Sequence, residues 1–464
     1  MVSIREYVGH LPVEQRELLA APARLLPPKM LYGPVYESTR RDIQKARTVP
    51  WWSSQKVAKR LGETLTAAWQ APYYSERPAY RGLERVARGE MTAHEALQAL
   101  PILTRREVTD HHRDMLVVDE SQVEISGTSG TSGEPVRFFL DRNRGAREWA
   151  YVVDTWSDSG YELGQWRAFF RGQTLSRGRS YILMPSVREL LVRLQAVQPE
   201  SIRMFWDLIA KRKIHFLHGY ASSLLYLAQL LDESDFDTSW RHEIRGLFPV
   251  SEQFTVAQED ILRRVFPNAV ISVFYGLSEK TAFARMDREH NYHTYPLYGY
   301  VELLDPKGDP VGIGERGRVV TTSLDGRGMP LVRYDTGDSA EFIRREPNGS
   351  VVFKDILSRR GREGLVRADG KLFSLTSYGF DGNEFPLIRR FKLRQDVPGR
   401  AVLQVQPSPS ASESDIAEFF REMALRGEHH VELELEVIDR FEPSASGKEV
   451  MLDQRIPNAP STWA

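Results

Sequence analysis

The chain has 464 residues, more than one hydrophobic core usually supports, so two or three domains are expected. Lysine and arginine number 62 and aspartate and glutamate 63, and the resulting net charge of −1 argues against a nucleic-acid or membrane-surface partner. The chain contains no cysteine, which excludes disulfides, a thiolate nucleophile, an iron–sulfur cluster and a thiolate zinc site.

The first part of the chain, residues 1 to about 120, is expected to be mostly helical. Residues 1–15 lack the apolar core of a signal peptide, and no apolar run reaches the ~18 residues that span a bilayer, so we expect a cytoplasmic location. The segment Val35–Lys45 and the segment from Thr92 have helical character. Thr104 followed by Glu107 has the capping-box spacing that marks a helix start.

A run of small hydroxyl residues and glycines follows this region. It consists of Thr128, Ser129, Gly130, Thr131, Ser132 and Gly133. Such a loop can wrap backbone N–H groups and hydroxyls around a polyphosphate. It lacks the lysine of a Walker loop and the glycine spacing of a dinucleotide fingerprint. Taken alone, a flexible surface loop explains it equally well.

From about residue 120 to 340, short apolar strands alternate with helical patterns. The segment Ser201–Ala210 has apolar residues on one helical face. The run Val270–Phe274 predicts a buried strand that enters a loop at Tyr275, and Val319–Thr322 predicts another strand. This alternation predicts an α/β layered domain.

The last ~100 residues predict a compact β-α-β unit, large enough to be a separate domain. Ala401–Val405 predicts a strand, and Ser412–Arg426 predicts a helix with one apolar face. Val431–Val437 alternates apolar and acidic residues, which is typical of a strand with one solvated face.

Four further segments carry chemically active groups. They are Tyr275–Glu279, Arg333–Asp338, Ser358–Glu363 and Ser444–Lys448. With the glycine loop, these segments resemble in identity and order the motifs of adenylate-forming enzymes, the superfamily of acyl-CoA synthetases, luciferases and peptide-synthetase adenylation domains. His218–Leu224 and Met329–Tyr334 are similar to segments of its phenylacetate-CoA ligase and CapK-like branch.

The resemblance implies an α/β fold with two domains. Residues 1–358 would form a large multi-layer N-terminal domain with a helical N-terminal region, and residues 359–464 a small mobile α+β domain. It also implies an ATP-dependent ligase that converts a carboxylic acid to an acyl-adenylate with release of pyrophosphate. The cofactors implied are ATP, Mg²⁺ and coenzyme A.

The resemblance assigns four phosphate-directed roles. The loop Thr128–Gly133 would hold the β- and γ-phosphates of ATP, and Ser278 would contact the α-phosphate. Glu279 would bind Mg²⁺, which takes oxygen ligands and shares its shell with phosphates. Lys448 would bridge the carboxylate and the α-phosphate as charge builds during adenylation.

The remaining nucleotide contacts follow from the same likeness. Tyr275 and Gly276 would contact adenine, and Ser251–Glu252 would line the adenine pocket. Asp338 would accept hydrogen bonds from the ribose hydroxyls, and Arg360 would reach the ribose or a phosphate.

The acid would contact Tyr220, Phe274 and Gly276. The segments Tyr181–Tyr220 and Val273–Thr281 are expected to line its pocket. Aromatic residues in and just beyond them, including Phe216 and Phe283, favour an aromatic acid, although such residues also fill cores.

Four of the assigned residues have an ordinary structural alternative. Glu279 could be a helix N-terminal charge, and Asp338 a turn residue. Arg360 could belong to a solvated charge run, and Lys448 could be an exposed loop lysine.

Three questions stay open at this level. The acceptor is coenzyme A by the superfamily's default, with an amine or hydroxyl as the alternative. Glu134 stands where many relatives have a phosphate-binding lysine, and Arg359 where the hinge usually has glycine, so a degenerate nucleotide-binding protein is a third hypothesis. The oligomeric state is undetermined, and a homodimer is compatible with the sequence.

Overall fold

The structure is a computed structural model that describes residues 28–127, 137–171, 179–193, 197, 201–252, 254–357, 364–378, 388–407, 411–439 and 452–457. By their contacts, these residues form two compact units. The first contains the described residues up to 126, between 136 and 165, and between 272 and 358. The second contains residue 127, the described residues between 166 and 271, and those beyond 358. The domain boundary predicted at residue 358 stays a prediction.

The N-terminal part of the first unit is helical, as predicted. Two helices begin with capping boxes, and the one at Thr104 is the predicted one: its amide donates to Glu107 at 2.8 Å. The helices are α3 (Pro28–Thr48), α4 (Pro50–Ala68), α5 (Pro72–Ser75), η2 (Pro78–Tyr80), α6 (Arg81–Ala87), α7 (Ala93–Ala99), α8 (Arg105–His111), η3 (Glu120–Gln122), α9 (Arg144–Trp156) and η4 (Ser157–Ser159).

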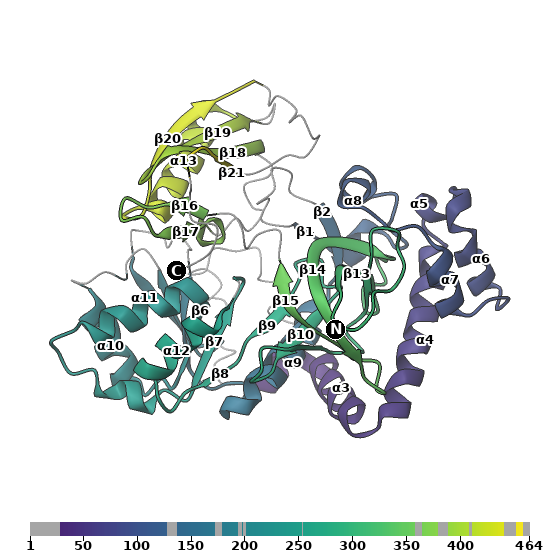
Figure 1. Ribbon diagram of the computed structural model, residues 1–464, viewed down its shortest axis with the longest axis horizontal. Helices are drawn as coiled ribbons and strands as arrows, with labels where there is room; N and C mark the ends of the chain where they lie inside the picture. The colour runs from purple at the N-terminus through teal and green to yellow at the C-terminus, as the bar shows by residue number, and fades with distance from the viewer. Residues whose placement is uncertain are drawn as a thin grey trace. The chain divides into compact units, whose positions relative to one another are not determined.

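A seven-stranded antiparallel sheet, ordered β12-β13-β14-β15-β11-β10-β9, completes the first unit (Figure 1). Its strands are β9 (Phe274–Gly276), β10 (Phe283–Met286), β11 (Tyr292–Thr294), β12 (Gly299–Leu304), β13 (Arg316–Ser323), β14 (Tyr334–Arg345) and β15 (Val351–Leu357). The predicted strand Val319–Thr322 is confirmed within β13. The alternation of strands and helices predicted as far as residue 340 is wrong here, because no helix occurs in the described stretch 274–357. Antiparallel neighbours are joined by turns and need no crossover helix.

Helices α4 to α8 of the first unit pack on one apolar core that also reaches the start of β14. This core contains residues of α4 to α8 together with Leu103, Val332 and Tyr334. The core thereby fixes Tyr334 at the base of β14. A separate two-stranded pair consists of β1 (Val123–Gly127) and β2 (Arg137–Asp141).

The second unit contains a six-stranded sheet ordered β4-β5-β3-β6-β7-β8, parallel except at β4 (Figure 1). Its strands are β3 (Arg167–Arg171), β4 (Tyr181–Met184), β5 (Glu189–Arg193), β6 (Phe216–Tyr220), β7 (Gly246–Val250) and β8 (Val270–Ile271). The associated helices are α10 (Ile202–Lys211), α11 (Ala221–Asp232), η7 (Ser239–Glu243) and α12 (Val256–Val265). The α/β alternation and the helix predicted over Ser201–Ala210 are confirmed in this unit.

The strand predicted over Val270–Phe274 is two strands. Val270 and Ile271 form β8, which pairs with β7, whereas Phe274 begins β9, which pairs with β10. Tyr275 consequently lies within a strand and not in a loop. A run of apolar residues predicts extended backbone but not which neighbour each part pairs with.

The C-terminal residues form a four-stranded sheet ordered β20-β19-β18-β21. Parallel β19 and β20 are connected through α13, which confirms the predicted β-α-β unit. The elements are β16 (Gly364–Val366), β17 (Leu372–Ser374), η9 (Leu375–Tyr378), β18 (Ile388–Val397), β19 (Arg400–Pro407), α13 (Glu413–Gly427), β20 (Glu432–Val437) and β21 (Leu452–Gln454). Among the described helices, none has both the length and the apolar character needed to cross a membrane.

Candidate functional site

A turn after β9 contains two predicted site residues, Ser278 and Glu279. The amide of Lys280 donates to the carbonyl of Leu277 at 3.1 Å and closes the turn. Ser278 is partly exposed. No helix begins at this turn, so the alternative of Glu279 as a helix N-terminal charge is wrong.

The carboxylate of Glu279 is held through one oxygen. Only 8% of the residue is exposed. The hydroxyl of Tyr334 donates to Oε1 at 2.8 Å, and Nη1 of Arg105 lies 3.6 Å from the same oxygen. Within the described part of the chain, no hydrogen bond to Oε2 is found. One oxygen is therefore anchored by the protein, while the other can serve a ligand.

Main-chain hydrogen bonds bring Arg105 and Tyr334 together. The amide of Leu103 donates to the carbonyl of Arg333, and the amide of Asp335 donates back to Leu103, both at 2.9 Å. This short parallel bridge ties the start of α8 to the start of β14. Because Tyr334 is fully buried, its hydroxyl is a fixed donor.

Tyr275 and Asp338, predicted to contact adenine and ribose, contact each other. The phenol of Tyr275 donates to Oδ2 of Asp338 at 2.7 Å. Burial, followed by the charge of Asp338, raises the pKa of Tyr275 well above its usual value. The phenol is therefore a neutral donor around neutral pH.

Asp338 lies at an irregularity inside β14 and not in a simple turn, so the turn alternative is wrong. The pairing of β14 with β13 shifts register between Asp335 and Ser339. Gly337 has a φ of 79°, in the region that favours glycine. The hydroxyl of Thr336 accepts from the amide of Asp338 at 3.1 Å, which fixes the backbone beneath the carboxylate.

Charged residues of α9, which the sequence analysis did not single out, hold the turn after β9. Nζ of Lys280 donates to Glu148 at 3.0 Å, and Arg144 donates to the carbonyl of Lys280 at 2.9 Å. Although burial acts to raise it, the charges of Lys280 and Arg144 hold the pKa of Glu148 below its usual value. In the sequence, Arg144 and Glu148 belong to no recognisable motif, so no sequence signal marked them.

Strand β12 approaches the same turn so closely that one position must be glycine. A Cβ on Gly299 would lie 1.7 Å from the carbonyl oxygen of Thr281. The hydroxyl of Thr321 donates to that of Thr281 at 2.8 Å. Gly299 and Thr321 therefore fix the backbone that carries Glu279.

Phe274 and Tyr275 lie on opposite faces of β9, since neighbouring strand residues alternate. The ring of Phe274 stacks on Phe283 at 4.5 Å between centroids. Gly276, at the exposed end of β9, pairs with Phe283 of β10. The structure thus brings Tyr275 to Asp338 and leaves Phe274 on the other face.

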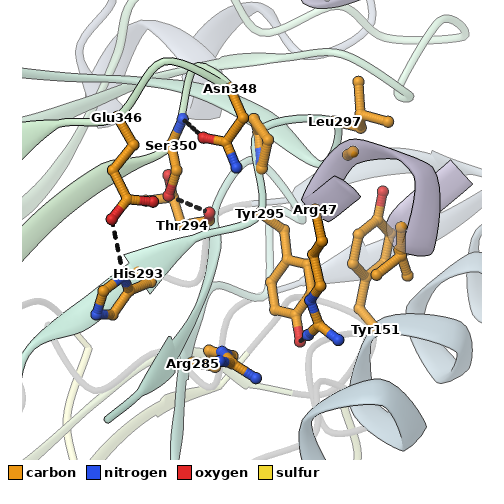
Figure 2. A pocket seen from close by; sticks show the side chains of 13 residues that line it. Arg47, Tyr151, Arg285, His293, Thr294, Tyr295, Leu297, Glu346, Asn348 and Ser350 are labelled. Carbon is orange, nitrogen blue, oxygen red and sulfur yellow. Dashed lines mark hydrogen bonds and ion pairs between the residues drawn. The ribbon is translucent and has the colours of Figure 1, made fainter. Parts of the chain in front are cut away.

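A pocket of about 220 Å³ lies on this other face (Figure 2). Arg285 of β10 pairs in register with both Phe274 and His293, which places these residues on the face opposite to Tyr275. The charged side chains that line the pocket are paired within the protein; for example, Nε2 of His293 lies 2.8 Å from Oδ2 of Asp287. It is lined by Ile43, Ala46, Arg47, Tyr151, Arg285, His293, Thr294, Tyr295, Pro296, Leu297, Glu346, Asn348 and Ser350. The pocket is therefore separate from the predicted nucleotide site.

The Mg²⁺ implied by the sequence fits Glu279. Mg²⁺ is usually held by one or two carboxylates together with substrate phosphates. Within the described residues, no cluster of three or more histidines, aspartates and glutamates could hold a metal without a substrate. Oε2 of Glu279, which accepts no hydrogen bond from the described residues, is the kind of single protein ligand that a magnesium–nucleotide complex needs.

Three further predicted residues lie in the second unit, at the carboxyl ends of its parallel strands. Tyr220 ends β6 and pairs in register with Val250, the last residue of β7. Ser251, with a φ of 66°, and Glu252 follow directly. In α/β sheets, ligands bind outside the carboxyl ends of the strands, so this edge suits a binding role.

Several predicted residues lie outside the described part of the chain. These are Thr128, Ser129, Gly130, Thr131, Ser132 and Gly133, together with Glu134, Arg359, Arg360 and Lys448.

Comparison with known proteins gives a likeness of fold. No family model and no curated protein sequence matches the chain. The structure of 2-hydroxyisobutyryl-CoA ligase in complex with 2-HIB-AMP and CoA superimposes with a TM-score of 0.55 at 16% identity, covering 89% of this chain and 92% of that one. An open conformation of that ligase gives a TM-score of 0.49 at 16% identity, covering 85% and 90% of the two chains.

The acyl acid amido synthetase AtGH3.15 gives a TM-score of 0.43 at 14% identity, covering 86% of this chain and 89% of that one. The fold of this chain is similar to that of 2-hydroxyisobutyryl-CoA ligase, an enzyme of the kind that the sequence motifs resemble.

Proposed function

We propose that the chain is an adenylate-forming carboxylate ligase of the phenylacetate-CoA ligase and CapK-like kind. A carboxylate oxygen of the acid attacks the α-phosphorus of ATP, the bond from that phosphorus to the bridging oxygen breaks, and pyrophosphate leaves. The thiol of coenzyme A then attacks the acyl carbonyl, and AMP leaves with the electron pair of the broken acyl–oxygen bond.

One observation carries the proposal. Two segments that are about sixty residues apart in the chain, Tyr275–Glu279 and Tyr334–Asp338, meet through two hydrogen bonds, from Tyr275 to Asp338 and from Tyr334 to Glu279. The superfamily pattern uses residues of these two segments around one nucleotide. The similarity of fold supports the same reading at a coarser level.

The described residues would act by binding and orienting the nucleotide. Asp338, oriented by its hydrogen bond from Tyr275, would accept hydrogen bonds from the ribose hydroxyls. Glu279 would bind Mg²⁺ through Oε2. Magnesium, when bound, would neutralise charge on the phosphates. Ser278, one residue before Glu279, would donate to the α-phosphate.

The residues outside the described chain complete the proposal. The loop Thr128–Gly133 would hold the departing pyrophosphate, and Arg360 would reach the nucleotide. Lys448, carried by a mobile domain of residues 359–464, would approach for adenylation and withdraw before acyl transfer.

The acceptor separates the proposal from its alternatives. Coenzyme A is the first choice, an amine or hydroxyl the second, and a nucleotide-binding protein without catalysis the third. Purified protein should be incubated with Mg²⁺, ATP and a panel of carboxylic acids, each with coenzyme A or with an amine. We expect AMP, pyrophosphate and an acyl thioester by mass spectrometry. An amide would select the second reading, and ATP binding without any AMP would select the third.

A further inference from the structure

Two arginines occupy paired positions at the carboxyl edge of the six-stranded sheet. Arg171 is the last residue of β3 and Arg193 the last residue of β5, and the two are register partners. Paired residues on neighbouring strands share a face, and the strands lie about 4.8 Å apart. The two guanidinium groups therefore extend from adjacent backbone positions on one face.

At their other end, β3 and β5 carry an arginine paired with a glutamate instead of a second arginine. Four residues earlier, Arg167 of β3 is paired in register with Glu189 of β5, and the two form a buried salt bridge on the same face. A buried arginine is ordinarily neutralised in this way. At the carboxyl edge, the position that would hold the acid is occupied by a second arginine.

Among the described residues, no acidic side chain neutralises this second pair. Within the described chain, the side chain of neither Arg171 nor Arg193 has a hydrogen-bond or ion-pair partner, and the guanidinium of Arg171 lies over the ring of Phe169 at 5.8 Å. Both residues are partly buried, and Nε of Arg193 is buried without a hydrogen-bond partner. Like charges side by side and a buried unpaired donor are both unfavourable, and an anion would relieve both.

The pair lies beside the predicted acid-binding residue. The register of β3 with β6 pairs Phe169 with His218, and their rings stack at 3.9 Å. Two residues further along each strand, on the same face, are Arg171 and Tyr220. Burial, followed by the charges of Arg167 and Arg171, holds the pKa of His218 well below its usual value, so this imidazole is neutral.

Strand order places the pair on the acid side of the edge. In the order β5-β3-β6-β7, the strand that carries Tyr220 separates the arginines from β7 and the Ser251–Glu252 step predicted to line the adenine pocket. A guanidinium pair suits a carboxylate or phosphate oxyanion, because each offers a fork of donors.

We propose that Arg171 and Arg193 bind a second anionic group of the acid, so that the enzyme activates dicarboxylic or otherwise dianionic acids. The inference rests on the proposed adenylation. One anionic group of the substrate would be the carboxylate that attacks ATP, and the other would lie between the two arginines. The arginines are specificity-determining residues in this account.

The test compares acids matched in shape. Acid-dependent ATP–pyrophosphate exchange is measured without coenzyme A for succinate against butyrate, glutarate against valerate, and the phthalate isomers against benzoate. We expect the preferred dianionic acid to exceed its monoanionic partner in kcat/KM by ~tenfold or more, as loss of a charge-assisted contact predicts. A preference for the monoanionic partners would overturn the inference and leave the proposed function intact. Exchange with none of a wider acid panel would instead count against the proposed function.

Variants identify which substrate the arginines hold. R171Q and R193Q should each raise KM for the dianionic acid by ~tenfold, leave KM for ATP within about twofold, and leave the monoanionic acids unaffected. R171K and R193K keep the charge but lose the forked guanidinium, so their KM for the dianionic acid should lie between those of wild type and the glutamine variants. They keep the test decisive if a glutamine variant fails to fold. R203Q, at an exposed arginine of α10, is the matched control. A rise in KM for ATP or for coenzyme A, with KM for the acid unchanged, would assign the pair to a phosphate and overturn the proposal.

Discussion

The phenol of Tyr275 donates a hydrogen bond to Oδ2 of Asp338 at 2.7 Å, although β9 and β14 are not neighbours in their sheet. Three strands, β15, β11 and β10, lie between them. Flat strands about 4.8 Å apart would hold these backbones nearly 20 Å apart, so the sheet must curl until β9 and β14 come close to each other. Curling is what brings two distant sequence motifs to one place.

This relationship predicts the effect of removing the phenol hydroxyl. In Y275F, Asp338 keeps its charge but loses its donor. We expect KM for ATP to rise by ~tenfold, because a hydrogen bond to a charged group contributes about 1.5–3 kcal/mol. Unchanged ATP titration would show that the Tyr275–Asp338 bond does not orient the nucleotide site. Y292F, which alters a partly buried tyrosine of β11 in the same sheet, is the control and should leave KM unchanged.

Glu279 and Tyr334 give two variants with graded expectations. E279Q keeps the side-chain shape but removes the charge that would bind Mg²⁺, and acyl-adenylate formation should fall by ~10² or more. Y334F keeps the charge but frees Oε1, so the Mg²⁺ concentration for half-maximal activity should rise by only ~tenfold. Direct titration of Mn²⁺ into protein with a non-hydrolysable ATP analogue would check both. Normal metal binding by E279Q would contradict the metal assignment.

Asp154 of α9 provides a stability prediction. It is 2% exposed, lies 2.8 Å from Arg40, pairs also with Arg47, and accepts from the hydroxyl of Tyr295 at 2.7 Å. D154N leaves two arginines without their counter-charge, which should cost about 3–5 kcal/mol. The urea midpoint should fall clearly in D154N and stay unchanged in D158N, whose carboxylate is exposed. Equal midpoints would mean that the network contributes little.

Lys448 tests the two-step mechanism. K448A should strongly lower the rate of adenylation, because a positive charge at the α-phosphate stabilises the transition state most as the pentavalent phosphorus develops. It should still convert supplied acyl-adenylate to product at close to the normal rate, since in the proposed mechanism the small domain would by then have turned away. Stopped assays of the two half-reactions would measure this. Equal loss of both half-reactions would make the lysine structural or the domain immobile.

The sequence predicted the local elements well where the signal was local. The Thr104–Glu107 capping box and the helices α10 and α13 all depend on residues close together in the chain. Strand β18 was missed, because a register shift near Ile388 breaks the period-two alternation that marks a strand.

Pairing was the part that sequence patterns could not supply. The run Val270–Phe274 reads as one strand, yet its ends join different sheets. Whether a strand has parallel or antiparallel neighbours depends on contacts distant in sequence, so the helix-free stretch after residue 271 was not foreseen.

The candidate site shows the same division. The motifs predicted Tyr275, Glu279 and Asp338 as a group, but not the two hydrogen bonds that orient them. Gly299 and Arg105 carry no motif, and their roles arise only from close approach in the folded chain. The aromatic residues Phe216 and Phe283 are buried in the core, so their number gives no support to an aromatic acid.

Acid-dependent ATP–pyrophosphate exchange tests the central claim most directly, because it requires reversible adenylation and no acceptor. Wild-type protein with Mg²⁺, ATP, labelled pyrophosphate and each acid of a broad panel should incorporate label into ATP for at least one acid. The incorporation should disappear without the acid or without Mg²⁺, and it should fall by ~10² or more in E279Q. Incorporation that is absent for every acid, in protein shown to be folded, would contradict the account of this chain as an adenylate-forming ligase.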